Sequence, residues 1–324
     1  MRLINDSIIQ HIYKMRHAIQ DVEDMLAHIS EGSNVNPHRT VIPVDEKNGS
    51  VLYMPSSDGT NYGAVKVVSI FPENPSKQLP TTQGTILLTE LTTGRHVALV
   101  AGSYLTRLRT GALSAISCKH LARTDSKILA VIGTGAMAFE QVLGIVEVLP
   151  IQKIYLVNRT TEKAEQFAER LEAYGVNAQF EVVTDADKAV SKADVVCCAT
   201  RSTQDVFSAS AVKPGTHIIG VGSYLPEMRE IPVDIIPKAA AIYADDVEGV
   251  QVEAGEFIAA AEQGEWRFDD LSGALHELVG QEYKRNAKAI TIFKSVGAAH
   301  FDLAVAKGVY RLAKHLGVGE DVEM

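Results

Sequence analysis

The sequence predicts an α/β fold in which a doubly wound parallel sheet is accompanied by a smaller α+β region. Short apolar strands alternate with helical segments over residues 127–297, a pattern typical of a parallel sheet with helices on its faces. A glycine-rich turn at residues 133–138 follows the first of these strands. Nearer the start of the chain, the turn at residues 92–95 separates two strand-like segments and predicts an antiparallel hairpin.

The length and composition agree with two ordinary globular domains. The chain has 324 residues, of which 46% are hydrophobic and 22% charged, and these values separate it from disordered proteins. Asp and Glu number 40 against 31 Lys and Arg, giving a net charge of −9. This balance argues against a nucleic-acid-binding protein, which needs clustered cations for phosphates.

Other classes of protein are also disfavoured. No apolar run approaches the roughly 20 residues that span a bilayer, so no membrane role is expected. The first residues lack the apolar core and cleavage site of a secretory signal, so a cytoplasmic location is expected. Cys118, Cys197 and Cys198 are too few for a four-ligand metal site, and no histidine pair has a ligand spacing. We therefore expect no metal, and neighbouring Cys197 and Cys198 are interpreted as core thiols.

The N-terminal region is predicted to begin with one amphipathic helix. Apolar residues from Ile8 to Ile29 recur at steps of three and four, while Asn5, Asp6 or Ser7 can cap the start and Gly32 can end the helix. A proline-containing loop is expected at residues 72–83. Strands are expected at residues 40–44, 50–54, 64–70, 84–90 and 96–100.

The rest of the chain follows the parallel α/β pattern. A last amphipathic helix, marked by Phe301, Val305 and Val309, is expected to pack back on the N-terminal region. Its parallel strands are expected at residues 127–132, 153–157, 179–183, 193–198, 216–221 and 241–244.

The glycine-rich turn has the Gly-x-Gly-x-x-Ala form of the Rossmann dinucleotide fingerprint. Its first glycine permits the tight turn, its second lets a pyrophosphate approach the backbone, and Ala138 permits close packing of helix on strand. The helix that follows directs its free N–H groups and positive dipole end at the phosphates. The candidate cofactor-binding residues are Gly133, Thr134, Gly135, Ala136 and Met137.

The end of the next strand indicates which dinucleotide is preferred. An NAD site usually has Asp or Glu there for the ribose hydroxyls, whereas this chain has Asn158, Arg159 and Thr160. The Arg159 guanidinium can bind a 2′-phosphate that a carboxylate would repel. NADP(H) is therefore expected to be preferred, with NAD(H) possible, although Arg159 as a solvated loop residue is the alternative.

Three cations in the N-terminal half are candidates for an anionic substrate. Lys66 interrupts an apolar, β-branched strand, so its charge must be exposed, paired or directed at a ligand, and alternation alone favours exposure. Arg39 lies just after Pro37, and either Arg107 or Arg109 can be a surface cation.

Taken together, these short motifs resemble the ornithine cyclodeaminase / mu-crystallin family over essentially the whole chain. The resemblance implies a substrate and dimerisation domain made of residues 1–116 and 298–324, a Rossmann domain at 117–297, and a homodimer. The matching motifs are Pro37-x-Arg39, Gly63-x-x-Lys66, Arg109-Thr110-Gly111-Ala112, Gly133-x-Gly135-x-x-Ala138, Asn158-Arg159-Thr160, Gly222-Ser223-x-x-Pro226 and Lys294-Ser295-Val296-Gly297.

The resemblance also assigns roles to the three cations. It implies that Arg39, Lys66 and Arg109 contact the substrate carboxylate, with Lys66 and Arg109 as the catalytic pair. Cyclodeaminases and the related alanine dehydrogenases have an Asp where this chain has Tyr224, and a phenol lacks that negative charge at neutral pH. The segment is therefore more similar to the reductases of Δ1-pyrroline-2-carboxylate and Δ1-piperideine-2-carboxylate, which yield proline and pipecolate.

Further positions follow from their place in such a fold. Thr200 and Val221 are expected near the cofactor, Ser295 is expected to approach the nicotinamide or to cap a helix, and Tyr224 is expected to line the substrate or only to pack. The alternatives are an ornithine cyclodeaminase, an alanine-type amino-acid dehydrogenase, or a mu-crystallin-like protein that binds NADP and a small ligand. The Lys66–Arg109 pair favours an enzyme.

Overall fold

A computed structural model describes residues 1–280 and 283–323. The chain divides into two compact units, one formed by Met1–Arg109 with Ala298–Met324 and the other by Thr110–Gly297. Helix α3 (Gly102–Leu121) crosses the division, and the boundary expected after residue 116 lies inside this helix. Within the described part of the chain, no helix is both long and apolar enough to cross a membrane.

The first unit is built on a mostly antiparallel sheet. Its strands, as far as the described residues go, follow the order β15-β1-β6-β5-β4-β3-β2. The hairpin predicted around residues 92–95 is confirmed, because β5 and β6 pair antiparallel. The very short outer strands β1 and β15 were not predicted, since two or three residues carry no periodic pattern. The strands are β1 (Arg2–Ile4), β2 (Thr40–Val44), β3 (Gly49–Ser57), β4 (Tyr62–Ile70), β5 (Thr82–Glu90), β6 (His96–Ala101) and β15 (Glu320–Asp321).

The single N-terminal helix expected from the apolar pattern is wrong, because the structure has two. Helix α1 (Asp6–Ile12) is capped by Asn5, as predicted, and α2 (Met15–Ser30) begins after a break at Tyr13 and Lys14. Both break residues are extended, and the Lys14 N–H donates to His17 Nδ1 at 3.0 Å. The apolar spacing continues through the break, so periodicity alone could not reveal it.

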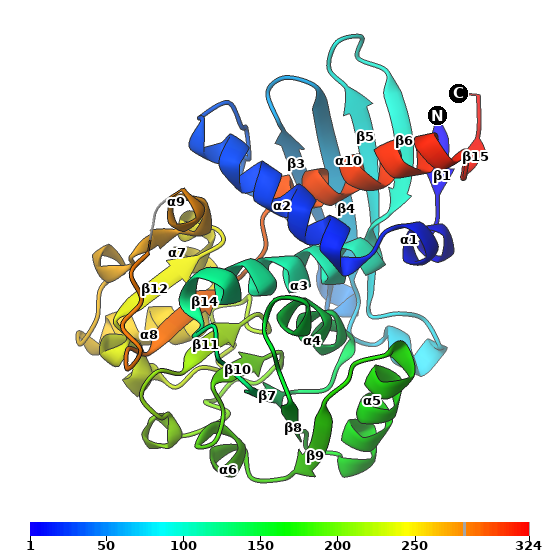
Figure 1. Cartoon of the computed structure of the whole chain (residues 1–324). Coiled ribbons are helices and arrows are strands. Elements are labelled where there is room, and N and C mark those ends of the chain that lie inside the picture. Colours follow the sequence, from blue (N-terminus) through cyan, green and yellow to red (C-terminus); the bar gives the residue numbers. More distant parts are fainter. Residues whose placement is uncertain (281–282, 324) are drawn as a thin grey trace. The chain divides into compact units, whose positions relative to one another are not determined.

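The final helix packs against the N-terminal region, as expected. In Figure 1, α10 (Ala299–Leu316) lies across one face of the sheet and runs beside α2. A small core under α10 joins it to strands β3 and β4 through Leu52, Met54, Val68 and Ala299. The chain end therefore supplies one layer of the first unit.

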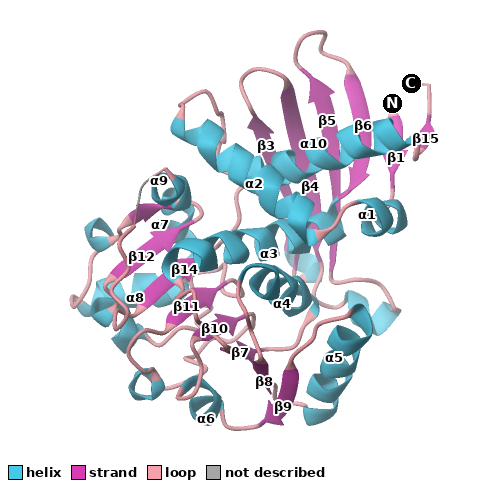
Figure 2. Ribbon diagram, viewed as in Figure 1, coloured by secondary structure: helices cyan, strands magenta, loops and turns pink. Residues whose placement is uncertain are grey.

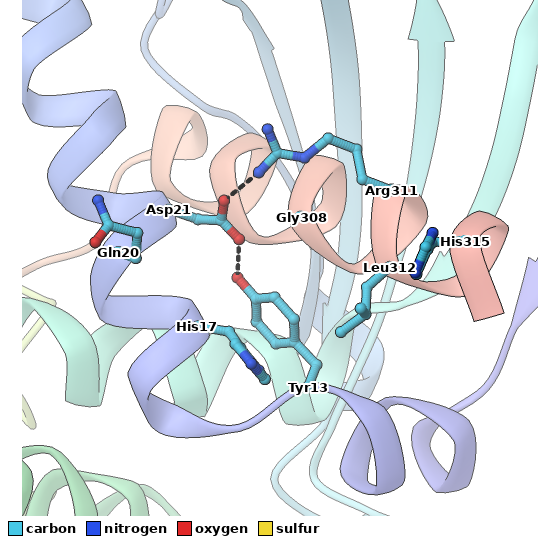
Figure 3. A pocket seen from close by; sticks show the side chains of 8 residues that line it. All are labelled: Tyr13, His17, Gln20, Asp21, Gly308, Arg311, Leu312 and His315. Carbon is cyan, nitrogen blue, oxygen red and sulfur yellow. Dashed lines mark hydrogen bonds and ion pairs between the residues drawn. The ribbon is translucent and has the colours of Figure 1, made fainter.

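The contact between α2 and α10 depends on Gly308. Figure 3 shows Tyr13 and Arg311 both directed at Asp21, and the Tyr13 hydroxyl donates to Asp21 Oδ2 at 2.5 Å. Arg311 forms an ion pair with the other carboxylate oxygen. These residues, with His17, Gln20, Leu312 and His315, line a surface hollow of about 320 Å³. A Cβ on Gly308 would lie 1.8 Å from Asp21 Oδ2, so only glycine admits the carboxylate here.

Replacing Gly308 with alanine is expected to lower the free energy of unfolding by about 1–3 kcal/mol. The new methyl group must displace Asp21 from both Tyr13 and Arg311. Urea unfolding of G308A, D21A and the double variant measures the effect. Because D21A removes the clash, the double variant should lose less stability than the sum of the single changes; full additivity would contradict the contact.

The second unit contains the parallel sheet. Over the described residues its order is β13-β12-β14-β11-β10-β7-β8-β9, and each pair of neighbours is parallel. The strands are β7 (Ile128–Ile132), β8 (Lys153–Val157), β9 (Gln179–Val183), β10 (Val195–Cys198), β11 (His217–Gly220), β12 (Ala241–Ala244), β13 (Gly273–Ala274) and β14 (Thr291–Lys294). Figure 2 shows the helices that connect and flank these strands: α4 (Ala136–Val148), α5 (Thr161–Tyr174), α6 (Ala186–Val190), α7 (Val247–Glu253), α8 (Gly255–Gln263) and α9 (Leu275–Val279).

The strand order of the parallel sheet reverses at β7. The chain runs outward from β7 through β8 to β9, then returns to the other side of β7 as β10. Ligands of doubly wound sheets bind at the carboxyl ends of the strands where the order reverses.

Strands β13 and β14 were not predicted, but the remaining strands of the parallel sheet lie where expected. Short 3₁₀ helices complete the two units: η1 (Asp45–Lys47), η2 (Asn74–Lys77), η3 (Ala209–Ala211), η4 (Val233–Lys238) and η5 (Phe268–Asp270).

Candidate active site

The predicted cofactor residues all follow strands that are neighbours in the parallel sheet. The glycine-rich turn follows β7, residues 158–160 follow β8, and Thr200 comes shortly after β10. Val221 follows β11 and Ser295 follows β14. Since all these strands are parallel, the structure brings these residues to the carboxyl ends of neighbouring strands, on both sides of the point where the strand order reverses.

The glycine turn has the geometry that a dinucleotide requires. Gly133 has φ +91°, and a Cβ there would lie 2.7 Å from the carbonyl oxygen of Ala199, so the tight turn needs glycine. Gly133 N–H also donates to the Val157 carbonyl at 2.9 Å, which ties the turn to the end of β8. Beyond the residues that adjoin Gly135, no atom lies within 4 Å of an added Cβ, so its backbone is open to a ligand.

Free polar groups at this turn fit a phosphate. Gly135 is the N-cap of α4 and supplies no side-chain capping bond to the first N–H groups of the helix. Thr134 Oγ1 is buried and has no hydrogen-bond partner among the described residues. Helix N–H groups, the positive helix end and an unsatisfied hydroxyl together suit a dinucleotide pyrophosphate. Arg159, exposed beyond β8, adds a cation at the same edge.

Glu230 holds two of the loops at this edge together. Its Oε2 accepts hydrogen bonds from Thr200 N–H at 2.8 Å and Thr200 Oγ1 at 3.0 Å. Its Oε1 accepts from Gly222 N–H at 2.6 Å and Ser223 N–H at 3.3 Å. Burial raises the pKa of the Glu230 carboxyl, opposed mainly by the charge of Lys294. This one side chain therefore fixes the segments after β10 and β11.

A second buried cluster holds the segment that carries Tyr224. Lys294 Nζ lies 2.9 Å from Glu256 Oε1 and donates to the carbonyl oxygen of Ser223 at 2.7 Å. The Ser223 hydroxyl in turn donates to Glu256 at 2.7 and 2.8 Å. Lys294 and Glu256 are fully buried, whereas Tyr224 is half-buried. The motifs at 222–226 and 294–297 thus meet in a single ionic network.

Ser295 does not cap a helix. Its hydroxyl donates to Asp245 Oδ2 at 2.6 Å, while Asp245 also accepts the N–H groups of Val296 at 3.0 Å and Gly297 at 2.8 Å. The N-cap of α10 is Ala298, which makes no side-chain cap. The capping alternative is therefore wrong: the Ser295 hydroxyl bonds to Asp245, and this carboxylate holds the loop after β14 in place.

The cysteines belong to the interior of the second unit. Cys118, Cys197 and Cys198 are free and buried. Burial raises the pKa of each thiol. The interpretation of Cys197 and Cys198 as core thiols is confirmed.

In the first unit, Lys66 is buried rather than exposed. It lies on the face of β4 that α10 covers, with 3% of its side chain accessible. Its Nζ is 2.6 Å from Asp302 Oδ2, and Arg109 Nε is 3.2 Å from Asp302 Oδ1. The surface interpretation of Lys66 is therefore wrong. Two cations share one buried carboxylate, so this cluster retains a net charge of one positive.

The ionisation of the cluster reflects burial and surplus positive charge. Burial lowers the pKa of Lys66 to about 8, against the attraction of Asp302 and with the repulsion of Arg109 and Arg39. Burial alone would raise the pKa of Asp302, but the charges and hydrogen bonds of Lys66 and Arg109 bring it below its usual value. Burial is thus the main cause of the Lys66 shift, and the two cations cause the Asp302 shift. The surplus positive charge of the cluster favours an anionic ligand.

The ambiguity between Arg107 and Arg109 is resolved by their surroundings. Arg107 is half-buried and its guanidinium lies 5.6 Å from the centre of the Tyr104 ring, whereas Arg109 is buried against Asp302. Arg39 is half-buried and close enough to Lys66 to affect its ionisation. Arg39, Lys66 and Arg109 thus belong to one electrostatic neighbourhood.

Sequence reasoning missed the carboxylates that organise both units. Asp302 had a detectable signal, because it precedes Val305 and Val309 by one and two helical turns and so shares the buried face of α10. Glu230 and Asp245 lie outside the parallel strands in segments without periodicity. Nothing local distinguished them from surface acids.

Comparison with known proteins places the chain in a family. The model of the ornithine cyclodeaminase/mu-crystallin family matches residues 3–316. The chain belongs to this family. The resemblance inferred from short motifs is therefore confirmed.

Members of the family give more specific similarities. A Δ1-pyrroline-2-carboxylate reductase of Bacillus cereus is 34% identical over 330 residues, covering all of both chains. The Thermococcus litoralis Δ1-pyrroline-2-carboxylate reductase, solved with NADH and L-proline, has a TM-score of 0.94 and 35% identity, over 99% of this chain and 100% of that one. An archaeal alanine dehydrogenase dimer with bound NAD has a TM-score of 0.92 and 29% identity, over 100% and 99%.

Family membership and architecture agree on the class of chemistry. The second unit has the fold and the turn geometry of a dinucleotide-binding domain, and the full-length relatives are oxidoreductases. This family member is an oxidoreductase that uses a nicotinamide cofactor.

Proposed function

We propose that the chain reduces a cyclic imine carboxylate, Δ1-pyrroline-2-carboxylate or Δ1-piperideine-2-carboxylate, to L-proline or L-pipecolate. The observation that carries this proposal is the buried Lys66–Asp302–Arg109 cluster, whose surplus positive charge suits one carboxylate. The B. cereus and T. litoralis relatives, named for reduction of the five-membered imine, support the same substrate class.

The cations act by holding the substrate. Lys66 and Arg109, with Arg39 as a third cation, grip the carboxylate through charge-assisted hydrogen bonds. A fixed carboxylate fixes the adjacent C=N carbon, and such orientation supplies much of the rate enhancement in a reaction between two bound molecules. We assign the proton relay to the imine nitrogen to the Lys66 ammonium.

The segments after the parallel strands hold the cofactor. We assign Gly133, Thr134, Gly135, Ala136 and Met137 to the pyrophosphate, and Thr200, Val221 and Ser295 to the nicotinamide end. When bound, the reduced nicotinamide supplies hydride for the imine carbon. The carboxylates of Glu230 and Asp245 keep the Thr200 and Ser295 segments in place.

Tyr224 is the residue that favours imine reduction over ammonia release as the activity of this chain. Cyclodeaminases resemble one another in an Asp at this position, and we assign Tyr224 to substrate binding instead. Reduction of a readily protonated imine does not need a carboxylate there. Purified protein should oxidise NADPH when either cyclic imine is added, and should not release ammonia from ornithine. Rapid ammonia release without imine reduction would overturn the proposal.

We further propose that NADPH is preferred over NADH. Arg159 is exposed at the end of β8, where no carboxylate follows the strand, and Asn158 Nδ2 donates to the Thr160 carbonyl at 3.0 Å to shape the turn. Arg159→Asp should reduce the preference for NADPH by about 10- to 150-fold, because a charge-assisted hydrogen bond contributes about 1.5–3 kcal/mol. The measurement is the ratio of kcat/KM for NADPH and NADH.

A matched charge reversal controls this experiment. Lys238→Asp changes an exposed cation in η4 and should leave the ratio unchanged. An unchanged ratio in R159D would contradict the 2′-phosphate assignment.

We also propose a homodimer joined through the first unit, and a cytoplasmic location for it. Strand β2 ends the sheet, and apolar side chains are exposed on and around it, including Val41, Ile42 and Tyr53. Such an edge is usually covered in a stable protein. The archaeal alanine dehydrogenase, described as a dimer, supports this choice. Sedimentation equilibrium of the purified chain tests it, and cell fractionation tests the location.

A further inference from the structure

Among the described residues, Asp302 forms ion pairs with both Lys66 and Arg109. It lies in the first turn of α10, where the positive end of the helix dipole favours a carboxylate. Its side chain is 1% exposed, so water contributes little to its solvation. Because water screens it little, this carboxylate attracts both Lys66 and Arg109 strongly and holds them in place.

We infer that Asp302 is a positioning residue that sets the direction of Lys66 and Arg109 and supplies the negative charge that stabilises the Lys66 ammonium. Its role in carboxylate binding rests on the proposed function. Its effect on Lys66 ionisation rests only on the structure of the first unit.

The geometry supports the positioning role. The two oxygens of Asp302 bind different cations, Oδ2 binding Lys66 and Oδ1 binding Arg109, so the carboxylate sets the distance between them. Lys66 has a flexible four-carbon side chain, and a fixed ion pair restricts its rotamers. Asp302 contacts Nε of Arg109 rather than the Nη1–Nη2 edge, with which arginine can bind a carboxylate through two parallel hydrogen bonds.

The electrostatic surroundings support the second role. Helix α10 directs Asp302 at Lys66, α3 contributes Arg109, and the segment before β2 contributes Arg39. The flanking strands place Met54 and Ile86 opposite Lys66, and neither can ionise. Burial and two cations therefore oppose the ammonium form, and Asp302 is the group that favours it. Removing its charge should leave about half or more of the Lys66 population neutral at pH 7.

The direct test measures Lys66 ionisation without any ligand. The ¹³Cε NMR signal of Lys66, identified by its absence in K66Q, is followed against pH in the full-length protein. In Asp302→Asn the midpoint should fall by at least about one pH unit, and Asp302→Glu should restore most of it. A midpoint unchanged in D302N would overturn the inference.

A second variant protects the test if D302N does not fold. Arg109→Gln removes a cation but keeps Asp302, and it should raise the Lys66 midpoint above that of the wild type. A lowered or unchanged midpoint in R109Q would count against the inference. Circular dichroism and thermal melting show which variants are folded.

The kinetic test separates positioning from general damage. In the wild type, binding of the cyclic imine and inhibition by L-proline should weaken as pH rises through about 8, where Lys66 loses its proton. In D302N this alkaline limb should move to lower pH, and KM should come closest to the wild-type value at pH 6. An equal increase in KM at every pH would indicate only structural damage and would overturn the role. If the wild type reduces no imine, the proposed function fails, while the NMR result still decides the inference.

Discussion

Lys66→Ala should lower kcat/KM for the cyclic imine by about 30- to 5,000-fold. The substitution removes the cation that pairs with the substrate carboxylate, and truncating one partner of a buried, hydrogen-bonded charge pair costs about 2–5 kcal/mol of binding free energy. The change removes the surplus positive charge of the cluster and leaves Arg109 and Asp302 as a neutral pair. The protein should therefore remain folded. Steady-state kinetics with varied imine concentration measure the loss, and most of it should appear in KM.

Lys47→Ala is the matched control for this substitution. Lys47 is exposed in η1 of the same unit, and its removal should change kcat/KM by less than about twofold. Thermal melting of both variants tests whether they are folded. If K66A reduced the imine as well as K47A does, the assignment of Lys66 to the substrate would be wrong even though the activity was correct.

Gly135→Ala should weaken NADPH binding by at least about tenfold while lowering the free energy of unfolding by no more than about 1 kcal/mol. An added Cβ at Gly135 meets nothing within 4 Å beyond the adjoining residues, and the extended backbone there (φ −80°) suits alanine, so only the weaker capping by alanine, about 0.5–1 kcal/mol, is lost. The loss comes from the bound state, in which the pyrophosphate must approach this backbone. Fluorescence titration with NADPH and thermal melting measure the two quantities separately.

Gly133→Ala provides the contrast. Here the Cβ would lie 2.7 Å from the Ala199 carbonyl oxygen, and φ is +91°, so the folded protein is strained even without cofactor. We expect a loss of about 1–3 kcal/mol in the free energy of unfolding. Wild-type affinity for NADPH in G135A would contradict the placement of the phosphates, whatever G133A does.

The glycine-rich turn and the strand ends around it were predictable because their sequence signals are local. Gly133 and Gly135 lie between an apolar strand and a helix, and this arrangement of neighbouring residues is itself the dinucleotide-binding fingerprint. Arg159 follows the next strand directly, so its position needed only the strand end. Because the strands are parallel, the segments that follow them all lie at the carboxyl ends of the strands.

Errors arose where the same local pattern permits two structures. The apolar spacing around Tyr13 fits one helix, yet the side chain of Tyr13 turns to Asp21 and the chain is extended there. Alternation along β4 permits Lys66 to face outward, and only the covering helix α10 makes its face the buried one. The choice between Arg107 and Arg109 likewise depended on which face of α3 met a carboxylate.

By itself, the sequence predicted the parallel α/β architecture and the glycine-rich turn, and the family resemblance singled out the three candidate cations. Only the tertiary structure decided that Lys66 is buried and that Asp302, 236 residues away, shares it with Arg109. The physical reason is the range of the interactions. Turn and strand preferences act between neighbouring residues, whereas burial and ion pairing depend on helices and strands that meet only when the chain folds.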